Sequence, residues 1–323
     1  MAGVTQQRTW FLLRRLVALV LTLIVLSFVV FSLIYLAPGN PVNALLGTHK
    51  SSPQAVAALE HKWHLDEPFL TQYWIWLKGV LHLDFGESIR TGERVIDSIT
   101  SRLGLSLWLA GYAFVLSVGF GIPLGILAAL RRRGPVDRSV VAASVLGVSA
   151  PAFVSGVVLI YIFGVELSWF PVYGSGSGIV DRIWHLTLPA LALALSVMAL
   201  IVKITRAAMI AVLDQDYIAF AYARGVGRRR IVFRHALRNA SIPIITAAGT
   251  VMVALITGAV IVEVTFALPG LGTLLIEAVD AKDLPTLQGV IMFLAVAVIL
   301  VNLLVDVTYS VIDPRVRLGG RKG

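Results

Sequence analysis

The sequence predicts an all-α, polytopic membrane protein with six transmembrane helices, and its composition, apolar segments and charge placement all support this. Charged residues make up 14% of the 323 residues and hydrophobic residues 58%, whereas charged residues account for about 25% of an ordinary soluble domain. The mean hydropathy of +0.86 also excludes a disordered chain, because disordered chains are poor in apolar residues. The sequence contains no cysteine, so disulfides and thiolate metal sites are excluded.

Six segments are long and apolar enough to cross a bilayer, which requires about 20 apolar residues in a helix. They are 16–36, 104–130, 140–163, 187–212, 243–262 and 287–311. The first is longer than the apolar region of a cleaved signal peptide, so we expect a retained anchor. Pro151 and Pro189 are expected to interrupt the third and fourth spans near their ends. Gly121 and Gly125 form a G-x-x-x-G pair, a spacing that allows close packing of helices.

The basic residues predict the orientation of these spans. With the N-terminus placed inside, most of the 27 Lys and Arg residues fall in internal segments, and most of the 18 acidic residues fall outside. Basic loops remain on the cytoplasmic side, so both termini are expected to be cytoplasmic. The net charge of +9 therefore follows the membrane topology and does not predict a nucleic acid partner.

The spans divide the chain into four parts. We expect a cytoplasmic N-terminus with the first helix over 1–36, an extracytoplasmic insert over 37–103, a five-helix core over 104–312 and a cytoplasmic tail over 313–323. Aromatic residues at helical spacing around 53–82 predict an amphipathic segment that either lies on the membrane or packs as a cap. His61 and His64 in the insert lack an evident third ligand, so no metal site is expected.

Catalytic motifs are missing from the sequence. It contains no H-E-x-x-H, G-x-S-x-G or P-loop pattern, so we expect a protein that is not an enzyme and binds no cofactor of its own. The centres of all six spans lack ionisable residues, which disfavours an ion-coupled carrier. A non-enzymatic membrane scaffold is the other alternative. Asp306, in the last span, is expected to form a structural ion pair with Lys203 or Arg206.

The longest and most basic internal loop, 214–242, predicts a pair of helices. Asp216 can cap a first helix, which Gly225 can end. A second helix is predicted over 228–243. Basic residues recur along it at four-residue steps, at Arg230, Arg234 and Arg238. Such a loop either interacts with the charged membrane surface or presents a helix pair to a cytoplasmic partner.

This loop resembles the cytoplasmic coupling loop of ABC importer permeases, known as the EAA loop. That motif places Glu-Ala-Ala three residues before a Gly, which is followed by a basic and apolar helix. Ala221 and Gly225 match the motif. The motif's Glu falls on Ala219 and its first Ala on Phe220, so a contact through a glutamate is not implied.

Motifs along nearly the whole chain, from about residue 8 to 318, are similar to those of the dipeptide/oligopeptide/nickel family of importer permeases. They are Leu36–Pro41, Leu65–Pro68 with Gln72 and Tyr73, Asp84–Ser88, Gly121–Ala129, Phe233–Asn239, Pro269–Gly272 and Asp313–Arg317. The long insert after the first span resembles that of the first permease of a pair in dipeptide and oligopeptide systems.

The resemblance implies a type I ABC importer permease in a bacterial cytoplasmic membrane. Its expected partners are a second, homologous permease, two cytoplasmic ATPases that bind ATP and Mg, an extracytoplasmic substrate-binding protein and the lipid bilayer. The expected substrates are di- and oligopeptides, with nickel, glutathione or haem as alternatives within the family.

The resemblance also implies two groups of site residues. ATPase contacts are expected at Tyr217, Phe220, Ala221, Gly225, Arg228, Arg229 and Arg234. The outer gate and the contact with the binding protein are expected at Glu263, Pro269, Gly270 and Gly272.

Overall fold

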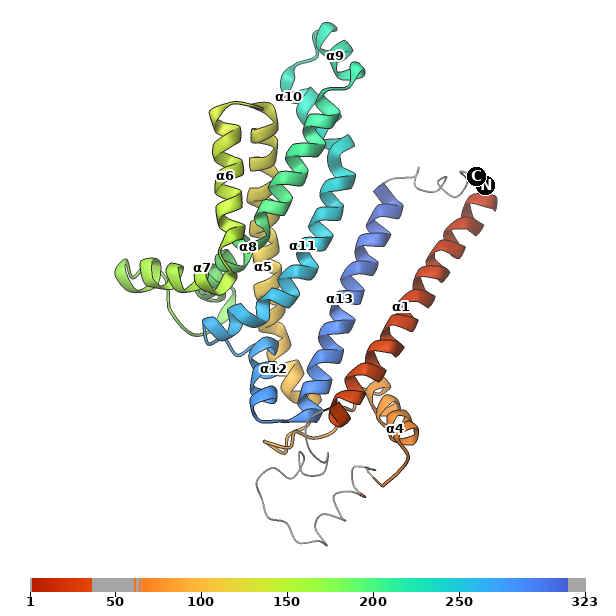
Figure 1. The fold of residues 1–323 in the computed structure, drawn as a ribbon. Coiled ribbons are helices and arrows are strands. Elements are labelled where there is room, and N and C mark those ends of the chain that lie inside the picture. Colours follow the sequence, from red (N-terminus) through yellow and green to blue (C-terminus); the bar gives the residue numbers. More distant parts are fainter. Residues whose placement is uncertain (1, 37–60, 62–63, 65, 313–323) are drawn as a thin grey trace. The chain divides into compact units, whose positions relative to one another are not determined.

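The computed structural model describes residues 2–36, 61, 64 and 66–312. Within these residues the chain is helical (Figure 1), and its one β pairing is an isolated bridge between Glu87 and Arg94. The helices are α1 (Ala2–Leu36), α4 (Phe69–Leu81), α5 (Val95–Leu130), α6 (Pro135–Ser149), α7 (Ala152–Leu159), α8 (Gly178–Leu213), α9 (Asp216–Ala223), α10 (Arg228–Arg230), α11 (Leu237–Thr265), α12 (Leu271–Asp280) and α13 (Leu284–Ile312). Two π-helical segments are η1 (Ile160–Glu166) and η2 (Ile231–Ala236).

Most of the predicted spans coincide with helices. In the described part of the chain, four helical stretches are long and apolar enough to cross a membrane: Val95–Leu130, Gly178–Leu213, Arg228–Thr265 and Leu284–Thr308. They coincide with the second, fourth, fifth and sixth predicted spans. At the place of the first, α1 carries a shorter apolar stretch over Val17–Leu33. The helical character predicted at these five places is therefore confirmed.

The third predicted span, 140–163, is broken at Pro151, the proline that was expected to interrupt it. Its residues form α6 and the α7–η1 pair, which are bent by 100° relative to each other. Ala150, at the break, has an extended backbone with φ −89° and ψ 125°, and Pro151 follows it. A residue before proline is pushed out of the helical region, and proline itself donates no backbone hydrogen bond, so the helix ends here.

Pro189 was expected to interrupt the fourth span, but it lies inside the continuous helix α8. Its side chain is buried in the helix packing. A proline removes only one backbone donor, and membrane helices tolerate this where neighbouring helices pack around the site. α8 therefore begins well before the predicted fourth span and continues through the proline.

The chain divides into two compact units. The first unit comprises Met1–Gly104 and Pro269–Ile299, and the second unit comprises Leu105–Leu268 and Leu300–Gly323. Two of the boundaries fall inside α5 and α13, so each of these helices contributes residues to both units, and the third lies between α11 and α12.

In the first unit, α4 packs on α1 through aromatic rings. Phe31 lies 5.4 Å from Phe69 and 5.6 Å from Tyr73 between ring centroids, within the range of favourable aromatic pairs. The Tyr73 hydroxyl also lies 2.8 Å from Ser27 Oγ. The remaining core of this unit joins the segment before α5 to α12 and α13 through buried residues that include Phe85, Ile99, Leu274 and Val290. Of the two possibilities for the amphipathic segment around 53–82, lying on the membrane or packing as a cap, α4 shows packing. Most of 53–68 lies outside the described residues.

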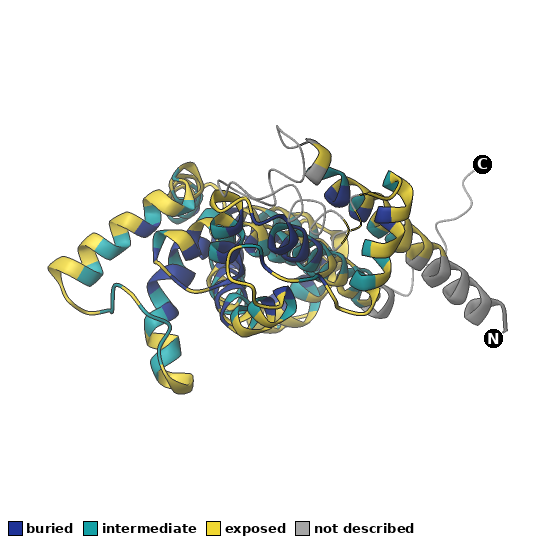
Figure 2. Cartoon of the chain, turned by 90° about the horizontal axis from the view of Figure 1, so that it is seen from below, coloured by how far each residue is buried: buried dark blue, intermediate teal, exposed yellow. Residues whose placement is uncertain are grey.

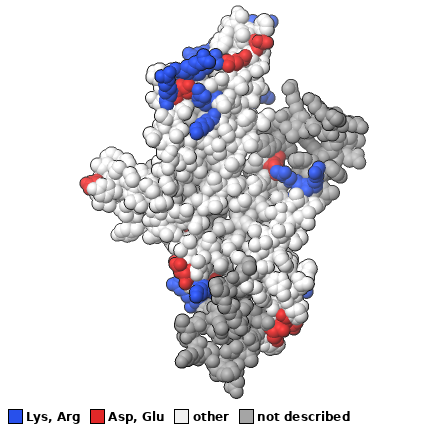
Figure 3. Space-filling view, viewed as in Figure 1, with Lys and Arg blue, Asp and Glu red and all other residues white. Residues whose placement is uncertain are grey.

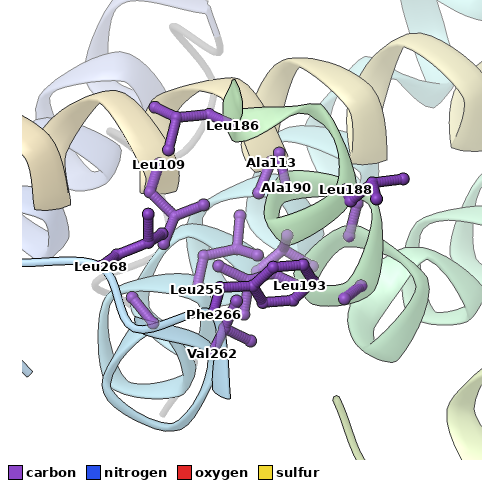
Figure 4. Close-up of a cluster of buried hydrophobic side chains, with 14 of the residues drawn as sticks. Leu109, Ala113, Leu186, Leu188, Ala190, Leu193, Leu255, Val262, Phe266 and Leu268 are labelled. Atoms are coloured by element: carbon purple, nitrogen blue, oxygen red, sulfur yellow. The ribbon is translucent and has the colours of Figure 1, made fainter. Parts of the chain in front are cut away.

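In the second unit, α8 packs against α6, α7 and α11. Figure 4 shows the cluster where side chains of α5, α8 and α11 meet, including Leu109, Leu193 and Leu255. Small residues on α8, such as Ala190 and Ala194, are fully buried there. In lipid there is no hydrophobic driving force between helices, so their association depends on van der Waals attraction. Small side chains strengthen this attraction because they allow the helices to approach closely.

The outward faces of these helices are apolar. Figure 2 shows exposed residues along the outer sides of helices and buried residues where helices face each other. In the second unit the exposed side chains include Val115, Phe120 and Leu304, with exposures of 64%, 57% and 68%. On the face shown in Figure 3, the surface over the middle of the second unit's helices carries no charge, and its Lys and Arg side chains gather near the 214–242 end. Apolar surface of this extent suits a lipid environment.

Candidate functional site

The 214–242 segment, here called the basic loop, contains the predicted first helix. This helix ends just before Gly225, as predicted. α9 spans Asp216–Ala223, and Gly225 follows with φ +79°, a left-handed conformation that suits glycine. The Gly225 N–H donates to Tyr222 O at 2.9 Å, and the Val226 N–H donates to Ala221 O at 3.1 Å. This pair of bonds is the Schellman arrangement, which satisfies carbonyls at a helix end.

The cap predicted for this helix is shifted by one residue. Gln215 occupies the capping position and makes no side-chain bond to the helix, while Asp216 is the first helical residue. At that position the Asp216 carboxylate interacts favourably with the positive end of the helix dipole and does not act as the cap.

The predicted second helix is longer than expected. Helical structure runs without a break over Arg228–Thr265, so Pro243 lies inside it and does not end it. After the short helix α10, the segment forms a π-helical turn, η2, in which Ile231, Val232 and Ala236 are buried. The basic residues expected on the opposite face are exposed, at Arg230, Arg234 and Arg238. The apolar buried face and the basic exposed face of this helix therefore remain separate through η2.

An open hollow of about 790 Å³ lies at the start of this helix. Its lining comprises Gly227, Arg228, Arg229, Arg230, Phe233 and Arg234. The Phe233 side chain is 57% exposed, and Phe220 on α9 is 71% exposed. Exposed aromatic and guanidinium groups together favour contact with a surface that is both apolar and acidic.

The predicted ATPase contacts are distributed over this surface in two groups. Arg228, Arg229 and Arg234 line the hollow. On α9 and its end, Tyr217, Phe220 and Gly225 are exposed, and Ala221 is half-buried.

α9 is anchored to the rest of the second unit. Ile218 is buried, with 1% of its surface exposed. The Asn239 side-chain amide donates to the Tyr217 hydroxyl at 2.9 Å, which links α9 to α11. Tyr217, predicted as a partner contact, is thus also an internal contact that fixes the position of α9.

Ion pairs that the sequence did not reveal join the α5–α6 turn (131–134) to α8. Arg206 donates through Nε to Asp137 Oδ1 at 2.5 Å and through a terminal nitrogen to Asp137 Oδ2 at 2.7 Å. Arg132 contacts both carboxylate oxygens of Asp214 at 2.7 Å. Gly134-Pro135 before an acidic residue is the pattern of a helix start, so the sequence could have placed Asp137 in the first turn of a helix but could not have identified Arg206 as its partner.

The expected pairing of Asp306 needs correction. Arg206 is paired with Asp137 and not with Asp306. Lys203 is exposed and forms no ion pair among the described residues. Asp306 itself is half-buried on α13 and has interactions of its own. The prediction assumed that the nearest charges by span depth would pair, whereas the first turn of α6 carries the acidic residue that contacts Arg206.

Glu263, predicted at the outer gate, is buried inside the second unit. Only 1% of its surface is exposed, and Ser106 Oγ donates to its Oε1 at 2.6 Å. A charged residue in such a position requires hydrogen-bonding partners because its desolvation is costly. In this structure Glu263 joins α11 to α5 and offers no surface to a partner.

The other predicted gate residues lie in the first unit, where they begin α12. Pro269 is exposed, whereas Gly270 and Gly272 are buried. Gly270 precedes the helix in an extended conformation, and its carbonyl accepts from the Leu274 N–H at 3.1 Å. These residues therefore form the N-terminal start of α12.

A second polar cluster in the first unit explains the Asp84–Ser88 motif. The buried carboxylate of Asp283 accepts from Ser88 Oγ at 2.5 Å, from the Ile89 N–H at 3.2 Å and from Thr286 Oγ1 at 2.8 Å. These bonds fasten the loop before α5 to the turn between α12 and α13. Beside it lies a polar pocket of about 120 Å³, where Arg102 contacts Glu277 at 3.2 Å. Nothing in the local sequence indicated this long-range pairing.

No metal-binding cluster is present among the described residues. They contain no group of three or more His, Asp or Glu side chains arranged to hold an ion. The surface of the basic loop is built from arginine side chains, exposed aromatic rings and the end of α9.

Two family models match the chain. The model described as "Binding-protein-dependent transport system inner membrane component" matches residues 121–318, and the model of the corresponding N-terminal part matches residues 8–110. The probable peptide ABC transporter permease protein y4tP of Sinorhizobium fredii is 37% identical over 310 residues, which are 95% of this chain and 99% of that protein.

Other relatives cover the chain to a similar extent. The dipeptide transport system permease protein DppB of Bacillus subtilis is 37% identical, with 95% of this chain and 98% of that protein aligned. The glutathione transport system permease protein GsiC of Escherichia coli K12 shows the same identity and coverage. Among solved structures, an inward-facing MetNI methionine ABC transporter chain matches with a TM-score of 0.58 at 17% identity, covering 67% of this chain and 96% of that one. This last similarity establishes the fold.

Proposed function

Because the chain belongs to the family of inner membrane components of binding-protein-dependent transport systems, we propose that it is a permease subunit of an ATP-driven importer of di- and oligopeptides. The observation that carries this proposal is the 37% identity over 95% of the chain to permeases named for peptide, dipeptide and glutathione transport. Glutathione is a small peptide, so these names share one substrate chemistry. Nickel and haem are the alternative cargoes.

The proposed assembly contains two different permeases, two ATPases and an extracytoplasmic binding protein. ATP and Mg bind to the ATPases, and this chain contributes no catalytic group. The charge distribution along the sequence supports an orientation with both termini and the basic loop on the cytoplasmic side. The binding protein then delivers the peptide to the opposite side.

The basic loop is the proposed contact with the ATPase. Its exposed Phe220 and the arginines around the hollow are suited to a partner surface with apolar and acidic groups. α9 is held by Ile218 and by the Tyr217–Asn239 bond, so a movement of the partner is passed to the long helix that begins at Arg228. Lever-like transmission requires a stiff element of this kind.

Gly225→Trp tests the docking role. A Cβ at Gly225 meets no atom within 4 Å, so a tryptophan there projects outward from the end of α9. We expect this variant to enter the membrane, to lose co-purification of the ATPases and to lose peptide uptake. Gly178→Trp is the matched control, because Gly178 also has φ +79° and open space around its Cβ but lies at the N-terminal start of α8. Normal ATPase association and uptake by Gly225→Trp would refute the docking role.

A further inference from the structure

The α5–α6 turn and the start of α6 are held by two ion pairs to the C-terminal part of α8 and to the residue that follows it. Arg132 and Arg133 lie in this turn, and Asp137 is in the first turn of α6. Arg132 binds Asp214 through both carboxylate oxygens, while Asp137 binds Arg206 through two hydrogen bonds. The first pair therefore connects the α5–α6 turn with the residue that follows α8, and the second connects the start of α6 with the C-terminal part of α8.

The inner pair is built into the fold. Asp137 is 4% exposed, and its Oδ2 also accepts from the Arg133 N–H at 2.9 Å. Arg133 has φ +63°, a left-handed conformation that is uncommon for a residue with a side chain. A strained backbone conformation persists where several surrounding contacts hold it in place. Here the Asp137 carboxylate accepts from the Arg133 N–H and also binds Arg206.

The outer pair lies where α8 becomes the basic loop. Asp214 is the residue directly after α8, and α9 begins at Asp216. The side chains of Arg132 and Asp214 are each 52% exposed. An ion pair with this exposure adds little to the stability of a protein. One terminal nitrogen of Arg132 lies 2.7 Å from both oxygens of the Asp214 carboxylate, and this charge-assisted contact ties the entry of the chain into the basic loop to the α5–α6 turn.

We propose that Arg132, Asp214 and Asp137 are positioning residues for energy coupling, which join the α5–α6 turn to the basic loop. This inference rests on the proposed function of the basic loop as the ATPase contact. Through these pairs, a displacement of the loop moves α5 and α6 together with α8. The Tyr217–Asn239 bond makes the corresponding connection to α11. The loop is thus fastened to helices on both of its sides.

The exposed pair supplies the cleaner test, because its removal does not leave a buried charge. The full transporter, with both permeases, the ATPases and the binding protein, is reconstituted in vesicles. Uptake of a radiolabelled dipeptide is measured per ATP hydrolysed in wild type, Arg132→Gln and Asp214→Asn. The stimulation of ATP hydrolysis by the binding protein is measured alongside, since it reports coupling whichever cargo is carried.

We expect both single variants to assemble and to hydrolyse ATP, while uptake per ATP and the stimulation fall by about two-fold to thirty-fold, the range for residues that transmit coupling without touching a ligand. The exchanged pair, Arg132→Asp with Asp214→Arg, is expected to restore a large part of the loss. Arg131→Gln is the matched control, because it removes an exposed arginine of the same turn that has no acidic partner among the described residues.

Two results overturn the inference: unchanged uptake per ATP and stimulation in both single variants, or an equal loss in Arg131→Gln. Gly225→Trp in the same assay shows whether only the positioning role of Arg132 and Asp214 is wrong or whether the docking of the basic loop on the ATPase is wrong as well. If Gly225→Trp uncouples the transporter and Arg132→Gln does not, only the present inference fails. If Gly225→Trp is also fully coupled, the docking role itself is wrong.

Discussion

Gly125 on α5 and Thr205 on α8 lie so close that a Cβ on Gly125 would stand 2.6 Å from the Cβ of Thr205 and 2.8 Å from the carbonyl of Val202. One turn earlier, a Cβ on Gly121 would meet Ile201 at 2.8 Å. The G-x-x-x-G pair in the sequence therefore lies where α5 and α8 approach each other closely, and it allows α8 to be in contact with α5 as well as with α11.

Gly125→Leu should destabilise the second unit. The added side chain must displace Thr205 or the backbone of α8, and overpacking of this kind typically costs about 1–3 kcal/mol. The measurement is thermal unfolding of the purified transporter in detergent. Gly119→Leu is the matched control on the same helix, because a Cβ at Gly119 meets no atom within 4 Å. Equal melting temperatures for the two variants would show that the contact at Gly125 does not exist.

Tyr73→Phe should loosen the attachment of α4 to α1. Ser27 Oγ donates its proton to Ile24 O at 2.8 Å, so the Tyr73 hydroxyl acts as the donor in the 2.8 Å bond between the two side chains. Loss of this buried bond should lower the free energy of unfolding by about 1 kcal/mol. Trp74→Phe alters a neighbouring ring that is 58% exposed, and it should change stability by less than about 0.5 kcal/mol. A denaturant titration that ranks the two variants in the opposite order would contradict this account.

Asp283→Asn should weaken the connection between the loop before α5 and the turn before α13. Ser88 and Thr286 both donate to Oδ2, whereas Ile89 donates to Oδ1. The amide retains one acceptor oxygen, so either the Ile89 N–H or the two hydroxyls lose their acceptor in a buried site. An unsatisfied buried group costs about 1–3 kcal/mol. Limited proteolysis of the 84–94 segment should become faster in this variant. Asp280→Asn, an exposed change at the end of α12, is the control and should leave the cleavage rate unchanged.

Much of the fold follows from local patterns in the sequence. Apolar segments of bilayer length predicted five helices correctly, and Gly225 predicted the end of α9 because few other residues adopt its positive φ. Pro151 interrupts its span as expected, whereas Pro189 lies inside the continuous helix α8 and does not. The residue alone does not determine whether a helix breaks; the packing around it does, and Pro189 is enclosed by neighbouring helices.

Long-range polar contacts could not be predicted from the sequence. Asp137 and Arg206 are 69 positions apart, and Ser88 and Asp283 are 195 apart, so no local spacing links them. The pairing of Arg206 with Asp306 was a wrong expectation for the same reason. Glu263 was expected at a surface because it ends a span, but its burial depends on Ser106 from another helix.

The central claim is that this chain couples ATP hydrolysis to the import of short peptides through its basic loop. The most direct measurement is the ATP-dependent uptake of a radiolabelled dipeptide by vesicles that contain both permeases and both ATPases, with the binding protein present. We expect uptake that requires this chain and ATP, and that is abolished by Gly225→Trp but retained in Gly178→Trp. Equal uptake from vesicles that lack this chain, or full uptake by Gly225→Trp, would contradict the account.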